Sequence, residues 1–315
     1  MKKSPKYVFG PVPSRRLGQS LGISPIPDKT CNYSCVYCQI GRTTHFTNKR
    51  QEFFPKGDIL SEIKDALLLE NKIDYITFVG EGEPTLNKNL GWLIKSCKEI
   101  TDIPIAVITN GALLYNQEIR QELLAADIVL PTLDAINQNL FKKLNRPIKE
   151  LKIVEIIDGM RAFRSEYQGQ IWMEIMLVAG LNDDLENIKE LKKVLDTIQC
   201  NRLYVNVPIR PPAEKWVKIP EKEKILRICE ILEAENIAFY ESVKGFHISS
   251  ESEIKEQILK TTTRHPLREE QIVDMLDLSK EKCLEILQSL KEEKKIKKII
   301  YNEKIFWVKS DTKKN

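Results

Sequence analysis

The sequence lacks any long uninterrupted run of apolar residues, and no stretch approaches the length of a membrane span. Its N-terminus, MKKSPKYVFGPVPSRR, has two lysines with no apolar segment after them, so a signal peptide is not expected. Seven cysteines are an odd number, and four of them stand alone, which argues against a framework of disulfides. These absences predict a protein of the reducing cytoplasm that has no membrane partner.

A strong charge of either sign is also missing. The net charge is +4 over 315 residues, which by itself argues neither for nor against binding to nucleic acid. Hydrophobic residues make up 42% of the chain and charged residues 30%, as in ordinary globular proteins. The length is sufficient for one large domain and one small domain.

Strand and helix patterns alternate through the first three quarters of the chain. Apolar segments rich in Ile and Val predict buried parallel strands at 20–26, 74–80, 104–111, 127–135, 170–180 and 202–209. Helical spacing of apolar residues predicts helices at 57–71, 90–100, 116–126, 149–166, 184–198 and 221–236. Six units are too few for a full eight-unit barrel. The expected fold is therefore α/β, an open, partial (β/α)6 barrel of the TIM type.

A second pattern begins after Phe246. HISSESE (247–253) is typical of a polar linker, and three short amphipathic helices are expected at 254–260, 266–278 and 279–293, the last with Ser279 as N-cap. Residues 296–308 then predict two strands joined by a turn around Asn302-Glu303. Three helices and a hairpin predict a winged helix-turn-helix domain. The predicted boundaries are 1–245 for the barrel and 246–315 for this domain.

Three cysteines, Cys31, Cys35 and Cys38, are crowded into the loop that follows the first predicted strand. A structural zinc site needs four ligands, and His45 is the only histidine close by in the sequence. A four-iron, four-sulfur cluster held by three thiolates instead leaves one iron open to a ligand from outside the protein. The triplet therefore favours a reactive cluster whose open iron binds a substrate or cosubstrate, with an inert metal site as the less favoured alternative.

CNYSCVYC (31–38) resembles the CxxxCxxC signature of the radical S-adenosylmethionine superfamily, including the aromatic residue before the last cysteine. The resemblance implies a partial barrel with one [4Fe–4S] cluster in the loop after its first strand. It also implies that S-adenosylmethionine binds the open iron and is reductively cleaved. The resulting 5′-deoxyadenosyl radical would abstract hydrogen from a substrate.

VGEGEPTL (79–86) resembles the GGEP motif of the same superfamily, which binds the methionyl amine. Gly82, Glu83 and Pro84 match this motif, and Glu81 stands where its first glycine is usual. A carboxylate suits the task, since an ammonium in a dry pocket needs a charged or strongly dipolar partner.

The resemblance implies further cofactor contacts at the ends of later strands, on the rim where barrel enzymes keep their sites. Thr109, Asn110 and Asp134 are candidates for ribose or carboxylate contacts, the backbone at Val178 and Ala179 for adenine, and Tyr37 for packing against the same ring. Simpler readings stay open at three positions. Asn110-Gly111 could form only a turn, Asp134 could cap the following helix, and Tyr37 could belong to the core.

The other four cysteines have no ligand pattern. Cys97, Cys229 and Cys283 fall on amphipathic helices and are expected to be buried apolar residues, and Cys200 precedes a strand without a ligand neighbour. One cluster is therefore expected, without an auxiliary one.

Several segments resemble a group of Fe–S oxidoreductases related to the tRNA-wybutosine synthases: FGPVPSRRLGQSLGISPIP, CQIGRTT, LNRP, IWMEIMLVAGLND and NVPIRPPAE. This kinship suggests RNA as the substrate. The wybutosine enzymes have an additional N-terminal cysteine set, whereas the first thirty residues here contain no cysteine, so the same reaction is not expected.

Arg146 and Arg210 each precede a proline and are candidates for binding a substrate anion. Arg15 and Arg16 are expected at the opposite end of the barrel and receive no role.

Three functions follow from these features. The first is radical modification of RNA, with tRNA foremost. The second is radical modification of a peptide, protein or small metabolite, with the C-terminal domain as a docking module. The third is a redox-sensing DNA-binding regulator, which the GEP segment disfavours because a sensor need not bind S-adenosylmethionine. Either enzyme would need an electron donor such as flavodoxin or ferredoxin, and the oligomeric state is not predicted.

Overall fold

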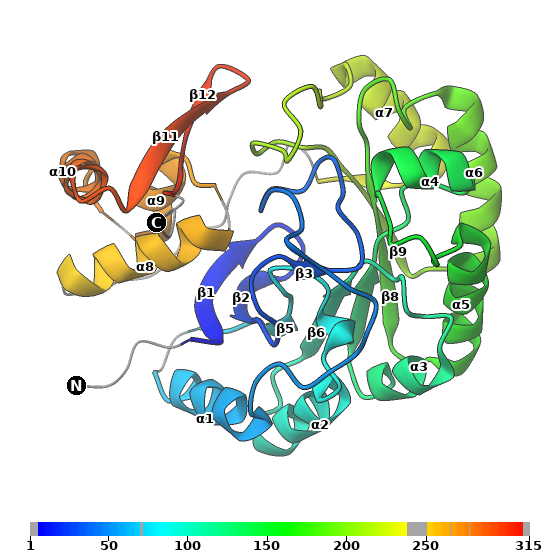
Figure 1. Cartoon of the computed structure of the whole chain (residues 1–315), viewed down its shortest axis with the longest axis horizontal. Helices are drawn as coiled ribbons and strands as arrows, with labels where there is room; N and C mark the ends of the chain where they lie inside the picture. Colours follow the sequence, from blue (N-terminus) through cyan, green and yellow to red (C-terminus); the bar gives the residue numbers. More distant parts are fainter. Residues whose placement is uncertain (1–5, 70–71, 238–250, 265, 277, 311–315) are drawn as a thin grey trace.

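An eight-stranded sheet forms the centre of the larger part of the chain (Figure 1). The computed structural model describes residues 6–69, 72–237, 251–264, 266–276 and 278–310. Its sheet has the order β1-β2-β5-β6-β7-β8-β9-β10, with β1 antiparallel to β2 and every other pair parallel. The strands span Val8–Ser14 (β1), Gly18–Ile23 (β2), Tyr75–Phe78 (β5), Ile105–Thr109 (β6), Ile128–Pro131 (β7), Gln170–Met176 (β8), Arg202–Asn206 (β9) and Glu235–Asn236 (β10). The order is open, with β1 and β10 at its two edges.

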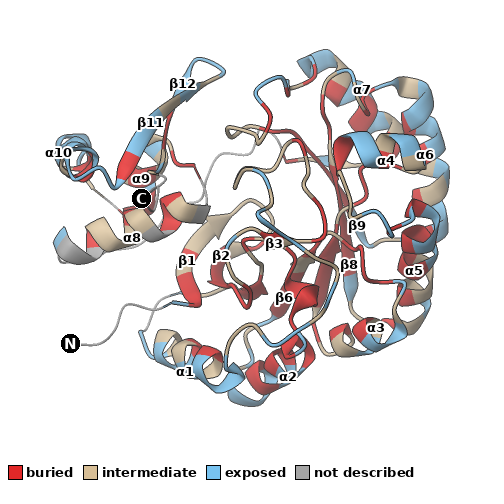
Figure 2. Cartoon of the chain, in the orientation of Figure 1, coloured by how far each residue is buried: buried red, intermediate tan, exposed pale blue. Residues whose placement is uncertain are grey.

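Helices cover the outside of this sheet (Figure 1). They span Lys56–Leu67 (α1), Leu90–Ile100 (α2), Gln117–Leu123 (α3), Gln138–Leu144 (α4), Ile153–Glu166 (α5), Leu185–Ile198 (α6) and Lys222–Leu232 (α7). α6 illustrates why: Ile188, Leu191, Leu195 and Ile198 recur every three or four residues and are buried, while the outer face is exposed (Figure 2). Asp184 begins this helix by accepting a hydrogen bond from the backbone N–H of Asn187.

The α/β fold with a mostly parallel sheet is confirmed, and it is consistent with the predicted partial barrel. Each of the six predicted strands has a counterpart, in β2 and in β5 through β9. Six described elements have no counterpart among the predictions: β1, α4, β10, the two-residue strands at Thr30–Cys31 and His45–Phe46, and a 3-10 helix at Pro84–Leu86. The helix predicted at 221–236 ends at Leu232, and residues 235–236 pair with β9 as β10 instead. β1 contains Pro11 and Pro13, which are tolerated because the strand lies at the edge of the sheet. α4 is a helix of seven residues that begins at its N-cap, Asn137.

The C-terminal residues form a smaller unit with a core of its own. Three helices, α8 (Glu251–Arg264), α9 (Glu269–Leu276) and α10 (Lys280–Glu292), pack with a hairpin of β11 (Ile296–Tyr301) and β12 (Lys304–Lys309). Ser279 caps α10, and the hairpin turns at Asn302 and Glu303, both as predicted. α8 packs against β1, beside one edge of the sheet (Figure 1).

The predicted junction between the two units can be compared with the structure only in part. The boundary at 245/246 and the linker residues 247–250 lie outside the described residues. Residues 251–253, predicted as linker, belong to α8, because the helix begins before its first buried apolar residue, Ile254.

No helix in the described parts of the chain combines the length and the apolar character needed to cross a bilayer.

Replacing Trp307 by alanine tests whether the C-terminal unit has an independent core. The Trp307 side chain is 1% exposed at the centre of this core, so its loss should lower the stability of the unit by about 3–5 kcal/mol. Calorimetry should show a C-terminal unfolding transition at lower temperature, with the barrel transition and the iron content unchanged. Trp216→Ala, at a position that is 50% exposed, is the matched control. A single transition that shifts as a whole would contradict the independent core.

Candidate functional site

The cysteine loop begins where a short strand meets the GEP segment. β3 (Thr30–Cys31) pairs with β4 (His45–Phe46), and its Thr30 carbonyl accepts a hydrogen bond of 3.0 Å from the backbone N–H of Glu83. Gly82 lies so close to this carbonyl that a Cβ atom there would be 1.8 Å from the oxygen. The glycine of the motif is therefore required by the close approach of two backbones.

A second segment holds the other side of the loop. The backbone N–H of Ser34 donates to the Asn145 carbonyl at 3.0 Å, that of Val36 to the Leu144 carbonyl at 2.9 Å, and that of Ile148 to the Asn32 carbonyl at 2.9 Å. These bonds give the LNRP segment (144–147) a structural explanation. It fixes the backbone between Cys31 and Cys38 to the end of α4.

The three thiols lie half-buried in this loop. Burial raises the pKa of each of them, and the neighbouring cysteines raise the pKa values of Cys31 and Cys35 further. The protons would therefore leave when iron binds, as is usual for thiolate ligands. Within the described ranges, no three Cys, His, Asp or Glu side chains converge closely enough to hold a single metal ion. The separated thiols fit a cluster, in which each cysteine binds a different iron.

Side-chain amides approach two of the sulfur atoms. Asn110 Nδ2 lies 3.7 Å from Cys31 Sγ, and Asn145 Nδ2 lies 3.6 Å from Cys35 Sγ. Hydrogen bonds to the ligating sulfurs are one of the means by which a protein sets the reduction potential of a cluster. The donor set therefore fits the [4Fe–4S] group that the cysteine spacing implies.

Glu83 occupies the centre of the GEP side of the site. Its carboxylate is 1% exposed and accepts hydrogen bonds from the Thr109 hydroxyl at 2.6 Å, the Asn110 N–H at 2.7 Å and both the N–H and the hydroxyl of Thr85. Burial raises the pKa of Glu83, and these donors oppose the rise. Pro84 begins a short 3-10 helix (Pro84–Leu86) directly after it. The structure thus brings Gly82, Glu83, Pro84, Thr109 and Asn110 together, as predicted from their motifs.

Asp134 is the corresponding carboxylate on the opposite side of the loop. It accepts hydrogen bonds from the Tyr37 hydroxyl, from Asn145 Nδ2 at 2.7 Å and from the Met176 N–H at 2.7 Å. Burial raises its pKa to about 6. The alternative that Asp134 caps the following helix is wrong, because Asn137 is the N-cap of α4. Contact of Asp134 and Tyr37 with the cofactor stays a prediction.

The segment after β8 is shaped by hydrogen bonds within the chain. The N–H of Val178 donates to Asn182 Oδ1 at 2.8 Å, and that of Ala179 donates to the Lys218 carbonyl at 3.0 Å. Val178 packs with Val36 and Tyr37 in a small apolar cluster. Its packing places this segment beside the cysteine loop, while the predicted contact with adenine stays a prediction.

The two arginines predicted to bind a substrate differ in their surroundings. Arg146 forms an ion pair with Glu214, which also binds Arg42 through two hydrogen bonds of 2.9 and 3.0 Å. Arg146 therefore has a carboxylate partner within the chain, which it shares with Arg42. Arg210 donates to Gln39 Oε1 at 2.9 Å, next to Cys38.

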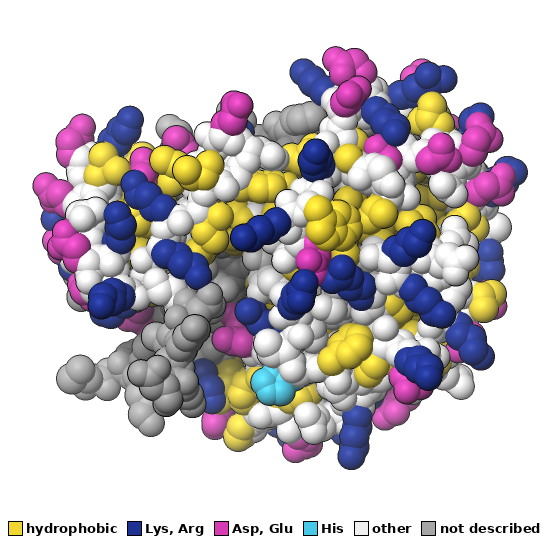
Figure 3. All heavy atoms as spheres, turned by 45° about the horizontal axis from the view of Figure 1, so that its top comes forward, with side chains coloured by type: hydrophobic (Ala, Val, Ile, Leu, Met, Phe, Trp, Pro, Cys, Tyr) yellow, Lys and Arg dark blue, Asp and Glu magenta, His cyan; other side chains and the backbone are white. Residues whose placement is uncertain are grey.

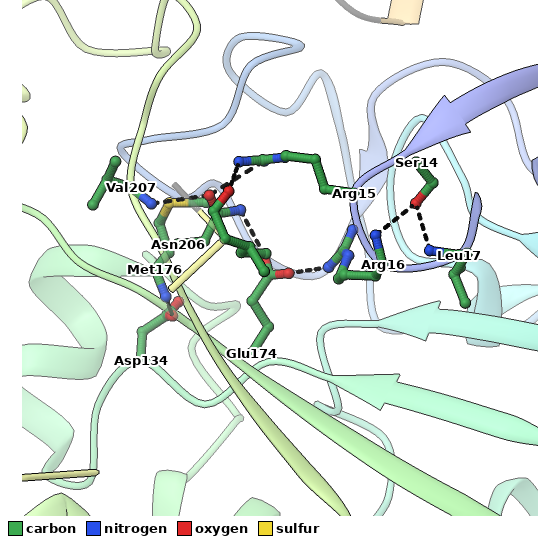
Figure 4. Close-up of polar contacts among 10 residues, drawn as sticks. Ser14, Arg15, Arg16, Leu17, Asp134, Glu174, Met176, Asn206 and Val207 are labelled. Atoms are coloured by element: carbon green, nitrogen blue, oxygen red, sulfur yellow. Dashed lines mark hydrogen bonds and ion pairs between the residues drawn. The ribbon is translucent and has the colours of Figure 1, made fainter. Parts of the chain in front are cut away.

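Arg15 and Arg16 lie in the turn that precedes β2, at the N-terminal end of the parallel strands, which is the end of the barrel opposite the cysteine loop, as predicted. Their side chains extend from this turn toward β8 and β9, where Arg16 pairs with Glu174 and Arg15 donates to Asn206, the last residue of β9 (Figure 4). These two contacts were not predicted, because β1, which leads into the turn, had not been predicted.

Several residues of the site were not singled out from the sequence. Asn32 accepts a 2.7 Å hydrogen bond from Asn110, and Asn145 links Cys35 to Asp134. Asn182 holds the segment after β8 by donating to the Met176 carbonyl at 2.9 Å. Asn32 lies within CNYSCVYC and Asn145 within LNRP, so membership of a motif was the available signal, although it does not show their tertiary contacts. No pattern in the sequence indicated the ion pair of Arg16 with Glu174.

The chain belongs to the radical SAM superfamily, which it matches over residues 26–192, more than half of its length. It is therefore an enzyme, with a [4Fe–4S] cluster and S-adenosylmethionine as its cofactors. Within this superfamily it is similar to the UPF0026 proteins. It is 39% identical to the one from Methanocaldococcus jannaschii, over 96% of this chain and 95% of that protein.

Two more distant similarities cover the barrel region in part. A probable dual-specificity RNA methyltransferase, RlmN 2 of Protochlamydia amoebophila, is 27% identical over 66% of this chain and 58% of that protein. The solved structure of a radical SAM methyltransferase from Sphaerobacter thermophilus has a TM-score of 0.53 at 20% identity, over 69% of this chain and 66% of that chain. The second similarity concerns the fold alone.

Replacing Gly82 by alanine should displace the cysteine loop. The added Cβ would collide with the Thr30 carbonyl, and overpacking of this kind costs about 1–3 kcal/mol. Anaerobically reconstituted protein should bind less iron and unfold at lower temperature. Gly57→Ala is the matched control: nothing lies within 4 Å of its added Cβ on α1, so it should gain about 0.5–1 kcal/mol. Equal iron content in both variants would refute the close-contact argument.

Replacing Glu83 by glutamine should separate cofactor binding from cluster assembly. The variant keeps the shape of the side chain but loses the charge that the methionyl ammonium needs, so affinity for S-adenosylmethionine should fall roughly tenfold to a hundredfold. Iron should remain at about four atoms per chain. Thr85→Val, which removes one donor but leaves the carboxylate, should bind the cofactor almost normally, and Cys35→Ala provides the cluster-free baseline. If Glu83→Gln binds S-adenosylmethionine as tightly as the native protein, Glu83 does not bind the methionyl ammonium, and Glu81 becomes the candidate.

Proposed function

We propose that this enzyme modifies RNA, with tRNA as the first candidate. When bound, the cluster and S-adenosylmethionine supply a 5′-deoxyadenosyl radical that abstracts hydrogen from the substrate. Cys31, Cys35 and Cys38 hold the cluster, and Glu83 with Asn110 orients the cofactor. An electron donor such as flavodoxin or ferredoxin belongs to the same proposal.

Two relationships support RNA. One relative is a probable RNA methyltransferase whose similarity spans two thirds of this chain, although the chain spans only 58% of that relative. The motifs around FGPVPSRR, LNRP and NVPIRPPAE resemble enzymes related to the tRNA-wybutosine synthases, which act on tRNA. Both relationships concern enzymes with a nucleic-acid substrate.

The position of the C-terminal unit is the observation that carries the proposal. α8 packs against β1, so this unit lies beside an open edge of the barrel. Lys and Arg side chains extend across one face from this unit to the barrel (Figure 3). Lys and Arg side chains spread over a face wider than one small-molecule pocket, with hydrophobic and some acidic side chains between them, suit contact with a long polyanion.

We infer that the C-terminal unit is a winged helix that contacts the RNA backbone. Its hairpin and the turn before it contain six lysines, Lys294, Lys295, Lys297, Lys298, Lys304 and Lys309. Lys295 is paired with Glu293 at 2.6 Å, and Lys298 lies over the Trp307 ring at 4.7 Å. Lysines on a hairpin would contact phosphates without selecting a sequence.

Anaerobic incubation with S-adenosylmethionine, dithionite and total RNA from cells that lack the enzyme tests this proposal. Mass spectrometry of the digested RNA should reveal a nucleoside of new mass that is absent when Cys35→Ala is used. Cleavage of S-adenosylmethionine without any new nucleoside, together with a mass change in a peptide or metabolite fraction, would favour the second predicted function instead. The third predicted function, a redox-sensing DNA-binding regulator, has no support, because the chain belongs to a superfamily of enzymes.

A further inference from the structure

Three arginines gather where the turn between β1 and β2 meets the segment after β9. Figure 4 shows Arg15 and Arg16 reaching from that turn toward Glu174 and Asn206. Arg210 follows β9 by four residues, and its Nη1 donates to Gln39 Oε1 at 2.9 Å. Gln39 directly follows Cys38, so this cluster of arginines adjoins the loop that carries the iron ligands.

Among the described residues, the charges in this arginine cluster do not balance. Glu174 pairs with Arg16, and both side chains are largely buried. Arg15 donates hydrogen bonds to uncharged acceptors, the Ile237 carbonyl and Asn206 Oδ1. Asn206 itself donates to the second oxygen of Glu174 at 3.1 Å, which occupies that carboxylate further. Within the part of the chain that the structure describes, Glu174 is therefore the one carboxylate that an ion pair joins to any of these three arginines.

Arg210 is the least satisfied of the three. Its Nε atom is buried and has no hydrogen-bond partner among the described residues. Burial, followed by the charges of Arg15, Arg16 and Arg268, lowers its pKa to about 9. Arg268 precedes α9, so the C-terminal unit contributes positive charge to the same place. A partly buried guanidinium among like charges is costly unless an anion compensates it.

We propose that Arg15 and Arg210 form a binding site for an oxyanion of the substrate, a phosphate or carboxylate group, beside the loop that carries Cys38. The planar guanidinium can donate two parallel hydrogen bonds to either group. A substrate held there lies next to the cluster and remains distinct from the Glu83 side, where the cofactor amine is expected. The inference rests on the proposed radical chemistry for its substrate, whereas anion binding itself is measured without turnover.

Equilibrium dialysis of radiolabelled inorganic phosphate against the full-length, cluster-loaded protein tests the site, at constant ionic strength and without oxygen. The native protein should bind phosphate saturably. Arg210→Met and Arg15→Met should each weaken binding roughly tenfold or more, as loss of a charge-assisted contact does. Arg42→Met, in which the lost guanidinium was already paired with Glu214, should bind phosphate like the native protein. Arg210→Lys keeps the positive charge, so its phosphate affinity should lie between that of the native protein and that of Arg15→Met. This variant keeps the test valid if Arg210→Met folds poorly.

Binding of S-adenosylmethionine to the same variants distinguishes the source of the anion. Unchanged cofactor affinity in Arg210→Met, with no competition between phosphate and S-adenosylmethionine, assigns the site to the substrate. Competition, with an equal loss of cofactor affinity, would assign the arginines to the carboxylate of S-adenosylmethionine and overturn the proposal. Unsaturable binding that is equal in all variants would overturn it as well. Absence of a new nucleoside in the RNA assay would leave the phosphate result intact, so the two failures are distinguishable.

Discussion

The buried carboxylate of Glu83 is the interaction on which the cofactor side of this enzyme depends. A carboxylate that is almost fully removed from water is stable only when donors surround it. Thr85 comes from the GEP segment itself, while Thr109 and Asn110 come from the end of β6, so the carboxylate ties two strand ends together. Asn110 then continues the chain of hydrogen bonds to Asn32 and Cys31. The GEP motif thus positions Cys31, a proposed cluster ligand, as well as Glu83, the proposed cofactor contact.

Asp134 repeats this arrangement on the other side of the cysteine loop. It receives Tyr37 and Asn145, and Asn145 also approaches Cys35. Each of two cysteines therefore has an amide donor whose orientation is set by a hydrogen-bonding partner: Asn110 by Asn32 and Glu83, and Asn145 by Asp134. Because hydrogen bonds to the sulfurs influence the reduction potential, Asn110 after β6 and Asn145 at the end of α4 would both tune a cluster bound by these cysteines. The barrel scaffold and the redox properties of the loop are coupled through these amides.

The sequence predicted the parts of this arrangement that local patterns record. Cysteine spacing, the GEP segment and the alternation of apolar strands with amphipathic helices were sufficient for the parallel sheet, the cluster loop and the meeting of Glu83 with Thr109 and Asn110. β1 was missed because it contains two prolines, which argue against a strand except at the edge of a sheet. Asn32 and Asn145 were missed because their importance comes from tertiary contacts. A single asparagine has no periodicity by which its burial beside a sulfur could be recognised.

The omission of β1 had a consequence for the chemistry as well as for the fold. Without that strand, the turn at Arg15 and Arg16 has no fixed position, and the reach of the two side chains into the barrel cannot be predicted. With β1 paired to β2, the side chains extend from the turn to Glu174 and Asn206, and Arg210, four residues after β9, donates to Gln39. The same strand receives α8, and with it the C-terminal unit that contributes Arg268. One edge strand therefore organises both the uncompensated positive charge and the position of the unit proposed to contact RNA.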